Sequence, residues 1–209
     1  MLSSLLIISA WFVTPLLFLA HPSYSLTEQE DDKTYDEEFF SITYPSSWHV
    51  SNEPWFPSQP GESGVILQND RKDTNQANRI TPRSSMDYSL ITVTVMPRES
   101  FFGSSDLSAL ELVDSIVEYA FSQERLAYYG AQLIADNYTS ISGTKARSIS
   151  FTTDGYYNLV INSADEKNVY QLSYTGQESK VQEELTEVQS IISSFKIKEM
   201  SDGLILSPV

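Results

Sequence analysis

The segment that most constrains the fold is residues 39–48, Phe-Phe-Ser-Ile-Thr-Tyr-Pro-Ser-Ser-Trp. Its aromatic and aliphatic residues alternate with Ser41 and Thr43, which is the period of a half-buried strand. Pro45 cannot donate a backbone hydrogen bond to a sheet, so we expect the strand to end there. Trp48 follows as a large apolar side chain, and we predict that it is buried and structural.

Residues 1–25 contain no Asp, Glu, Lys or Arg and form an apolar stretch that ends in Ser23-Tyr24-Ser25. Small residues at the −3 and −1 positions are typical of a cleavage site, so we predict a secretory signal peptide. The mature protein is then secreted or extracytoplasmic, at the outer face of a membrane or in a periplasm-like space. The alternative is an uncleaved N-terminal anchor, because about 20 apolar residues can span a bilayer.

The bulk composition excludes several classes of function. The chain has no cysteine, which excludes disulfides, thiol catalysis and zinc–thiolate sites. Its net charge of −15 disfavours nucleic acid, because binding to polyanions depends on clustered Lys and Arg. For the same reason we expect no direct lipid binding after signal cleavage. Basic protein surfaces and cations are the compatible partners.

Residues 26–38 carry seven acidic side chains against one lysine, and this charge run predicts an acidic flexible linker. Carboxylates are the ligands that calcium prefers. The weak calcium candidates in this run are Asp31, Asp32, Asp36, Glu37 and Glu38. The EF-hand spacing with its central glycine is absent, so the linker is favoured over a calcium site, and no other metal or cofactor is expected.

The chain beyond residue 48 begins with strands and a helix. We predict a short strand over 64–68 and a β-branched strand over 89–96, separated by a polar stretch, 69–87, that lacks periodicity. A helix is predicted over 106–128, because Ser108 and its partner three residues later have the spacing of a capping box.

Four strands, 132–141, 145–153, 156–162 and 169–174, are then joined by short turns, two of which contain Ser-Gly or Asp-Gly. The last helix is predicted from about Glu178, with a second capping box that involves Thr175. Its apolar residues recur at intervals of three and four, and Glu183, Glu184 and Glu187 are expected to face water. The predicted fold class is α+β, an antiparallel β-sheet sandwiched with helices.

Three motifs, in this order along the chain, resemble the PsbP family of extrinsic lumenal photosystem II proteins and their relatives. They are Tyr44-Pro45-Ser46-Ser47-Trp48, the strand Val169-Tyr170-Gln171-Leu172-Ser173-Tyr174-Thr175, and Ile191-Ile192-Ser193-Ser194-Phe195. The resemblance implies a PsbP-like α-β-α sandwich over residues 39–198. Residues 199–209 would then be a C-terminal tail.

The same resemblance implies a non-enzymatic extracytoplasmic accessory or binding protein that docks on a protein partner, such as a membrane-bound complex. An alternative is a photosystem II extrinsic protein of the thylakoid lumen that supports oxygen evolution with calcium binding. The acidic composition departs from the Lys-rich docking surfaces of the photosystem-binding members. The family gives a fold and a compartment but no catalytic residue.

A secreted hydrolase is the rival class of function. His49 is the only histidine left after signal removal, and no Gly-x-Ser-x-Gly motif supplies a nucleophile. A hydrolase would therefore need carboxylates such as Asp154 or Asp165. We expect no catalytic residue in this chain.

Two further features indicate surface roles. Asn137-Tyr138-Thr139 is a glycosylation sequon, whose use requires an exposed edge or an outward face of the predicted strand. Trp55 and Phe56 in a Pro-rich loop are candidates for partner contact. We expect the loops over 52–63 and 69–87 to reach the partner, and Tyr128 and Tyr129 are among the aromatic residues that could line a binding cleft.

Overall fold

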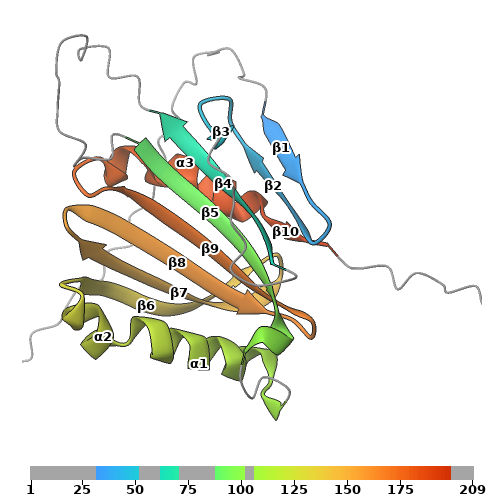
Figure 1. Cartoon of the computed structure of the whole chain (residues 1–209). Helices are drawn as coiled ribbons and strands as arrows, with labels where there is room; N and C mark the ends of the chain where they lie inside the picture. The colour runs from blue at the N-terminus through green and yellow to red at the C-terminus, as the bar shows by residue number, and fades with distance from the viewer. Residues whose placement is uncertain (1–31, 52–61, 71–87, 102–105, 199–209) are drawn as a thin grey trace, which may run out of the picture.

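A computed structural model describes residues 32–51, 62–70, 88–101 and 106–198 (Figure 1). The predicted signal peptide, the C-terminal tail, Trp55, Phe56 and Asp31 lie outside these residues. Within the described part, no helix is long and apolar enough to cross a membrane.

The described residues form two antiparallel sheets and three α-helices. The larger sheet has seven strands in the order β3-β4-β5-β9-β8-β7-β6, and the smaller has three in the order β1-β2-β10. The strands of the larger sheet are β3 (His49–Val50), β4 (Ser63–Asp70), β5 (Tyr88–Pro97), β6 (Gln132–Ile141), β7 (Thr144–Thr153), β8 (Tyr156–Ala164) and β9 (Asn168–Gln177). Those of the smaller are β1 (Lys33–Asp36), β2 (Phe40–Tyr44) and β10 (Lys196–Ile197).

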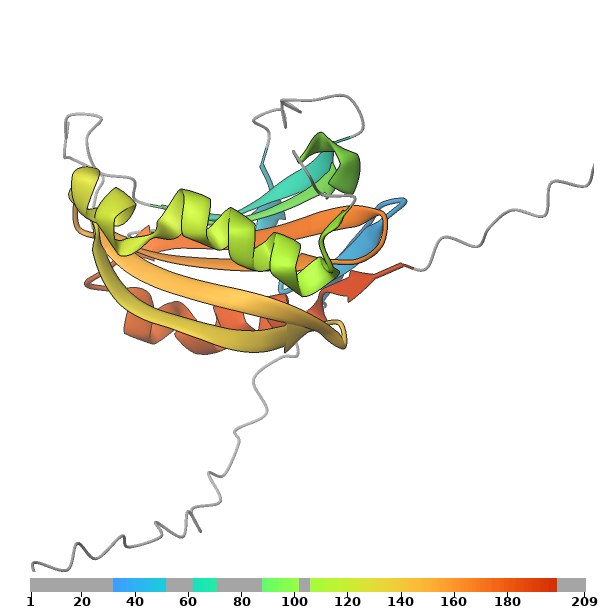
Figure 2. The same ribbon diagram turned by 90° about the horizontal axis from the view of Figure 1, so that it is seen from below.

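The larger sheet is the middle layer of a sandwich (Figure 2). On one face lie α1 (Ala109–Phe121) and α2 (Gln123–Tyr128), after the short 3₁₀ turn η1 (Arg98–Ser100). Helix α1 packs on β7 and β8. On the other face lies α3 (Val181–Ser194), with the smaller sheet beside it through contacts with β2. The predicted α+β class, with an antiparallel sheet between helices, is confirmed.

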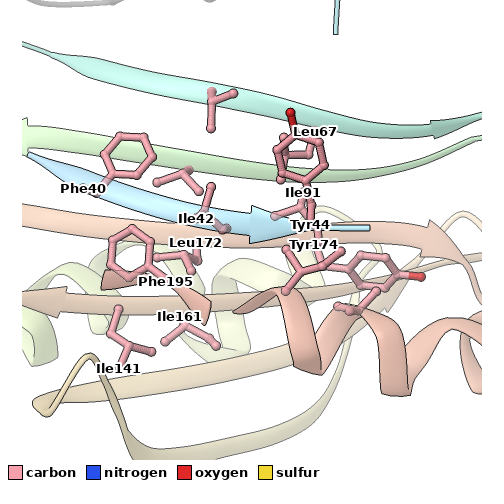
Figure 3. Close-up of a cluster of buried hydrophobic side chains, with 14 of the residues drawn as sticks. Phe40, Ile42, Tyr44, Leu67, Ile91, Ile141, Ile161, Leu172, Tyr174 and Phe195 are labelled. Atoms are coloured by element: carbon pink, nitrogen blue, oxygen red, sulfur yellow. The ribbon is translucent and has the colours of Figure 1, made fainter. Parts of the chain in front are cut away.

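The main core lies between the larger sheet and the layer formed by α3 and the smaller sheet (Figure 3). The alternation predicted at the start of the domain holds, because Phe40 and Ile42 of β2 are fully buried in this core. Trp48 is 0% exposed, which confirms that it is buried. A second, smaller cluster joins α1 to the opposite face through Leu112 and Val113.

The two glycine turns have the backbone that tight hairpins require. Ser142 and Gly143 have φ values of 50° and 78°, and Asp154 and Gly155 have 51° and 80°. Positive φ at both central residues defines the type I′ turn, whose twist matches that of the flanking strands. The predicted hairpins β6–β7 and β7–β8 are therefore correct.

The continuous helix predicted over 106–128 is wrong, because the chain breaks at Ser122 into α1 and α2. The capping box at Ser108 is present, with its side chain accepting from the N–H of Glu111 and the Glu111 carboxylate accepting from the N–H of Ser108. At Ser122 the backbone is extended, with ψ of 152°, and α2 turns so that Leu126 is buried. Burial of this leucine and contact of α2 with β6 offset the loss of helical continuity.

The second capping box is also wrong. Strand β9 continues to Gln177, which pairs with Tyr156, and α3 begins only at Val181 without a side-chain cap. Pairing with β8 extends the strand through Thr175, so this residue cannot cap a helix. Glu184, expected to face water, is instead 8% exposed.

The acidic linker predicted over 26–38 is incorrect for its last part. Residues 33–36 form β1, which pairs antiparallel with β2 and places Tyr35 opposite Ile42. The Tyr35 ring lies 6.0 Å from that of Phe40. A run of charged residues stays unfolded when it has no apolar side chain to bury. Tyr35 is such an apolar side chain, so this part of the run can pack on the domain.

Candidate functional site

Four large hydrophobic side chains are exposed where α1, α2 and β6 meet. Tyr119 lies in the last turn of α1 and is 73% exposed, Tyr128 and Tyr129 at the end of α2 are 83% and 68% exposed, and Ile134 of β6 is 55% exposed. Helix α2 contacts both of the other elements. We call Tyr119, Tyr128, Tyr129 and Ile134 the aromatic surface. Exposed aromatic residues grouped in this way are characteristic of protein–protein interfaces.

The local sequence explains why these side chains point outward. Leu126 turns the buried side of α2 inward, so the residues after it are left on the outer side. Tyr128 and Tyr129 contact each other edge to face, with ring centroids 5.2 Å apart. Gly130, with φ of +71°, then reverses the chain into β6, as expected for a residue that follows a helix.

Ile134 reaches the surface through a β-bulge. Leu133 pairs with Phe151 and Ala135 with Ser150, so Ile134 is the extra residue of β6. A bulge re-aims the side chain of the inserted residue and bends the strand locally. Ile134 is therefore presented to solvent at the last strand of the sheet order.

Arg125 holds the first aromatic residue of the surface in place. Its guanidinium lies 4.1 Å from the centroid of the Tyr119 ring, within the range of a cation–π contact. It also donates a hydrogen bond to the backbone carbonyl of Tyr119. A cation is favourable at this position because the carbonyls at the end of a helix carry partial negative charge.

The acidic residues on the other side of α1 are gathered around Arg147 of β7. Its guanidinium contacts Asp136 at 2.6 Å, Glu118 at 3.0 Å and Asp114 at 3.3 Å. The hydrogen bond to Asp136 is the largest cause that raises the pKa of Arg147. Tyr138 donates to Asp114 at 3.0 Å, and this bond raises the pKa of the phenol. These contacts fasten α1 to β6 and β7.

Two of the four described calcium candidates make contacts within the protein. Asp36 pairs with Lys198 at 2.9 Å, and Glu37 accepts a hydrogen bond from Tyr35 at 2.7 Å. Asp32 is exposed at the start of β1, and Glu38 lies in the turn that leads to β2. Across the part of the chain that the structure describes, no group of three or more His, Cys, Asp or Glu could hold a metal ion.

The candidate catalytic residues are not brought together. Asp154 and Asp165 lie in the turns at opposite ends of β8, which spans roughly 30 Å at about 3.4 Å per residue. Asp165 accepts hydrogen bonds from the Tyr170 hydroxyl and from the N–H groups of Lys167 and Asn168. It therefore organises the β8–β9 turn. His49 is half-buried on β3, opposite Gln68.

The sequon residue Asn137 is exposed on β6. Strand β6 is the last strand in the order of the larger sheet, so Asn137 lies on an exposed edge strand, as use of the sequon requires. Its modification stays a prediction.

Sequence reasoning missed part of the aromatic surface. Tyr119 follows Leu112 and Ile116 at helical spacing, which is typical of a core residue. It is exposed because no other described element covers this side of α1 at its end. Ile134 lies between Leu133 and Ala135 in an apolar run, and nothing in the sequence indicates the bulge at this position. The adjacent pair Tyr128-Tyr129 did carry a signal, because two bulky side chains at a helix end cannot both point into the core.

Comparisons with known proteins place this fold. A family model described as PsbP-like protein matches residues 22–197. A comparison with curated proteins found no match.

The solution structure of cyanobacterial PsbP (CyanoP) from Synechocystis sp. PCC 6803 is similar, with a TM-score of 0.50 and 12% identity over 85% of this chain and 100% of that one. A crystal structure from Bacteroides thetaiotaomicron VPI-5482 has a TM-score of 0.46 and 11% identity, with 82% of this chain and 50% of that one covered.

LpqN, involved in cell envelope biogenesis of Mycobacterium tuberculosis, has a TM-score of 0.41 and 10% identity, with 86% of this chain and 100% of that one covered. Identities this low show the fold alone. The family match covers most of the chain, which therefore belongs to the PsbP-like protein family.

Proposed function

We propose that this chain is a non-enzymatic accessory protein that works outside the cytoplasm and binds a protein partner through the aromatic surface. The observation that carries the proposal is the exposure of Tyr119, Tyr128, Tyr129 and Ile134 on three elements that contact one another. Binding energy at protein interfaces is concentrated in a few such residues, with tyrosine among the most frequent.

The electrostatics of the chain agree with a protein partner. With a net charge of −15, it is attracted to basic protein surfaces and repelled by nucleic acid. Arg125 stacks on Tyr119 of the aromatic surface, and the acids Asp114 and Glu118 on the other side of α1 are bound to Arg147. A partner could therefore cover the aromatic surface without removing water from unpaired carboxylates of α1.

Membership of the PsbP-like family supports an accessory role without catalysis. The separation of Asp154 from Asp165 along β8 argues in the same direction, because paired carboxylate catalysis needs the two groups within about 10 Å. The charge-free apolar N-terminal stretch supports export. Mapping the N-terminus of the native protein tests this part, and we expect a new terminus near Leu26.

Site-specific photo-crosslinking tests the surface. A benzophenone amino acid at position 128, introduced in the native host, is expected to form a crosslink to one protein of the envelope or membrane fraction. The same group at Val50, which is exposed on β3 at the other end of the sheet, is the matched control.

Tyr129→Ser combined with Ile134→Ser should abolish the crosslink from position 128 while leaving the far-UV circular dichroism unchanged. Equal crosslinking from positions 128 and 50 would contradict the proposal, as would a crosslink that survives the double substitution.

A further inference from the structure

An apolar groove lies beside α1, on the face of the sheet that this helix leaves open. It has a volume of about 660 Å³ and is bordered by α1 on one side and by the end of β5 and η1 on the other. Helix α1 packs on β7 and β8, and the neighbouring strands β9 and β5 form the open part of the face. A volume of this size is within the range of small-molecule sites.

The α1 wall is a stripe of residues at helical spacing, Leu112, Ser115, Ile116, Tyr119 and Ala120. Such residues lie along one side of a helix. Met96 and Phe101 form the facing wall. The stripe runs from Leu112 to Ala120, eight helical steps, so the groove follows the helix for about 12 Å. A wall of this length matches an extended apolar chain of several carbon atoms.

The acidic residues of α1 are kept out of this groove. Glu111 is engaged in the capping box, while Asp114 and Glu118 bind Arg147 on the opposite side of the helix. The groove wall therefore presents no carboxylate from α1, although the chain as a whole is strongly acidic. An anionic group in the groove therefore meets no carboxylate of α1.

A cation lies next to Tyr119, one of the residues that line the groove. Arg125 stacks on the ring of Tyr119, which is itself a wall residue. Arg125 forms no ion pair with any residue that the structure describes. Its contacts with the ring and with the Tyr119 carbonyl fix the guanidinium in position. The site thus combines an apolar groove with one positive charge held beside its wall residue Tyr119.

Gln171 of β9 supplies a polar group to the lining. Its side-chain amide donates to Asn162 at 3.0 Å, and Asn162 is fully buried with its own Nδ2 unpaired. A buried amide without a partner costs free energy, so the pair is retained at some expense to stability. The hydrogen bond orients Gln171 in the groove.

We propose that the groove binds the anion of a single-chain carboxylic acid of the fatty-acid type. The alkyl chain lies along α1, and the carboxylate pairs with Arg125. The absence of lipid binding inferred from net charge applies to a membrane surface, whereas a monomeric ligand responds to the local positive charge. The groove shares Tyr119 with the aromatic surface, but the titration below uses no protein partner, so this inference and the proposed function can fail separately.

Calorimetric titration of the mature protein with decanoate and with decanol tests the proposal. We expect decanoate to bind at least about fivefold more tightly, because a charge-assisted hydrogen bond to Arg125 is available only to the acid. Arg125→Gln should abolish this preference and leave decanol unaffected, and Arg125→Lys should retain most of it. Lys145→Gln removes a cation from the opposite side of α1 and should change neither affinity.

Ile116→Trp fills the groove and should weaken both ligands at least about tenfold. A readout that needs no variant is the methyl resonance of Met96, which should shift on addition of decanoate. Equal affinities for acid and alcohol would overturn the proposal. So would an unmoved Met96 resonance, or binding to phosphatidylglycerol vesicles without binding to monomeric decanoate.

Discussion

The carboxylate of Glu184 accepts a hydrogen bond from the phenol of Tyr174 at 2.7 Å, in the core beneath α3. The hydroxyl of Ser89 donates to the same oxygen at 2.6 Å. One side chain of the helix is thus bonded to two strands of the larger sheet, β5 and β9. A buried carboxylate is tolerated only where such donors replace water, and here they fix the position of α3 on the sheet.

Glu184→Ala is expected to destabilise the domain by about 2–4 kcal/mol, because it leaves the buried hydroxyls of Tyr174 and Ser89 without their acceptor. Denaturant unfolding followed by tryptophan fluorescence measures the change, because Trp48 is fully buried in the folded state. Glu183→Ala, one residue earlier and exposed, is the matched control and should have an effect within about 0.5 kcal/mol. Equal effects at the two positions would show that the hydrogen bonds contribute nothing.

Gly176→Ala should destabilise through the same cluster. A Cβ at this position would collide with the Tyr174 hydroxyl and lie 3.0 Å from the Ser89 hydroxyl oxygen. Tyr174 is fully buried and cannot swing away, so we expect a cost of about 1–3 kcal/mol. Combining Gly176→Ala with Tyr174→Phe removes the hydroxyl and should recover part of the loss. A double variant no more stable than the sum of the single effects would exclude this steric explanation.

Trp48→Ala is expected to cost about 3–5 kcal/mol, because it removes a fully buried indole from the main core. A thermal or denaturant unfolding transition measures the loss. Val50→Ala, two residues later and 38% exposed, is the control that should change stability little. An unchanged midpoint for Trp48→Ala would mean that the tryptophan does not anchor the start of the domain.

The elements with strong local signals were predictable from the sequence. The hairpins followed from Ser-Gly and Asp-Gly pairs, and the start of α1 from the Ser108 capping box. Elements that exist only through tertiary pairing were not. Strand β1 depends on Tyr35 packing against Phe40, and β10 consists of only two residues that pair with β2. Each of these two strands is too short, or has too few apolar residues, to show the alternation that predicts a strand.

The candidate site was less predictable than the fold, because its residues depend on how elements meet. Tyr119 and Arg125 belong to different helices, and their contact follows from the break at Ser122 that the sequence pattern did not reveal. Glu184 has the position of a surface residue on the helix, and only the hydroxyls of Ser89 and Tyr174 make its burial possible.

Tyr35 is expected to titrate well above the ordinary value of about 10. Partial burial, together with the hydrogen bond to Glu37, raises its pKa to about 12. The folded state therefore holds this proton more tightly than the unfolded chain does. The resulting stabilisation is complete below pH about 10 and is lost as the pH rises toward about 12.

Carbon-13 labelling of the tyrosine rings allows the Tyr35 titration to be followed by NMR. Glu37→Gln should lower the midpoint only in part, because burial is the larger cause of the shift. A wild-type midpoint near the ordinary value would show that β1 does not enclose this side chain.

The acidic run offers a direct test of where the folded domain begins. Removing residues 26–32 should leave stability nearly unchanged, because the pairing of β1 with β2 starts at Lys33. Removing residues 26–38 deletes β1, the contact between Tyr35 and Phe40, and the ion pair of Asp36 with Lys198. We expect that longer deletion to cost about 2 kcal/mol or more, because burial of an aromatic ring and an aromatic contact are both lost.

Calcium separates this structural role from a metal site. A ligand that binds only the native state raises the melting temperature in proportion to RT ln(1 + [L]/Kd), so a weak site should respond at millimolar calcium. Asp36 and Glu37 are already held by Lys198 and Tyr35, and we therefore expect calcium to shift the melting temperature no more than magnesium does. A calcium-selective rise that disappears with the 26–38 deletion would make these carboxylates a binding site. Equal free energies of unfolding for the 26–32 and 26–38 deletions, measured without added metal, would show that β1 does not stabilise the domain.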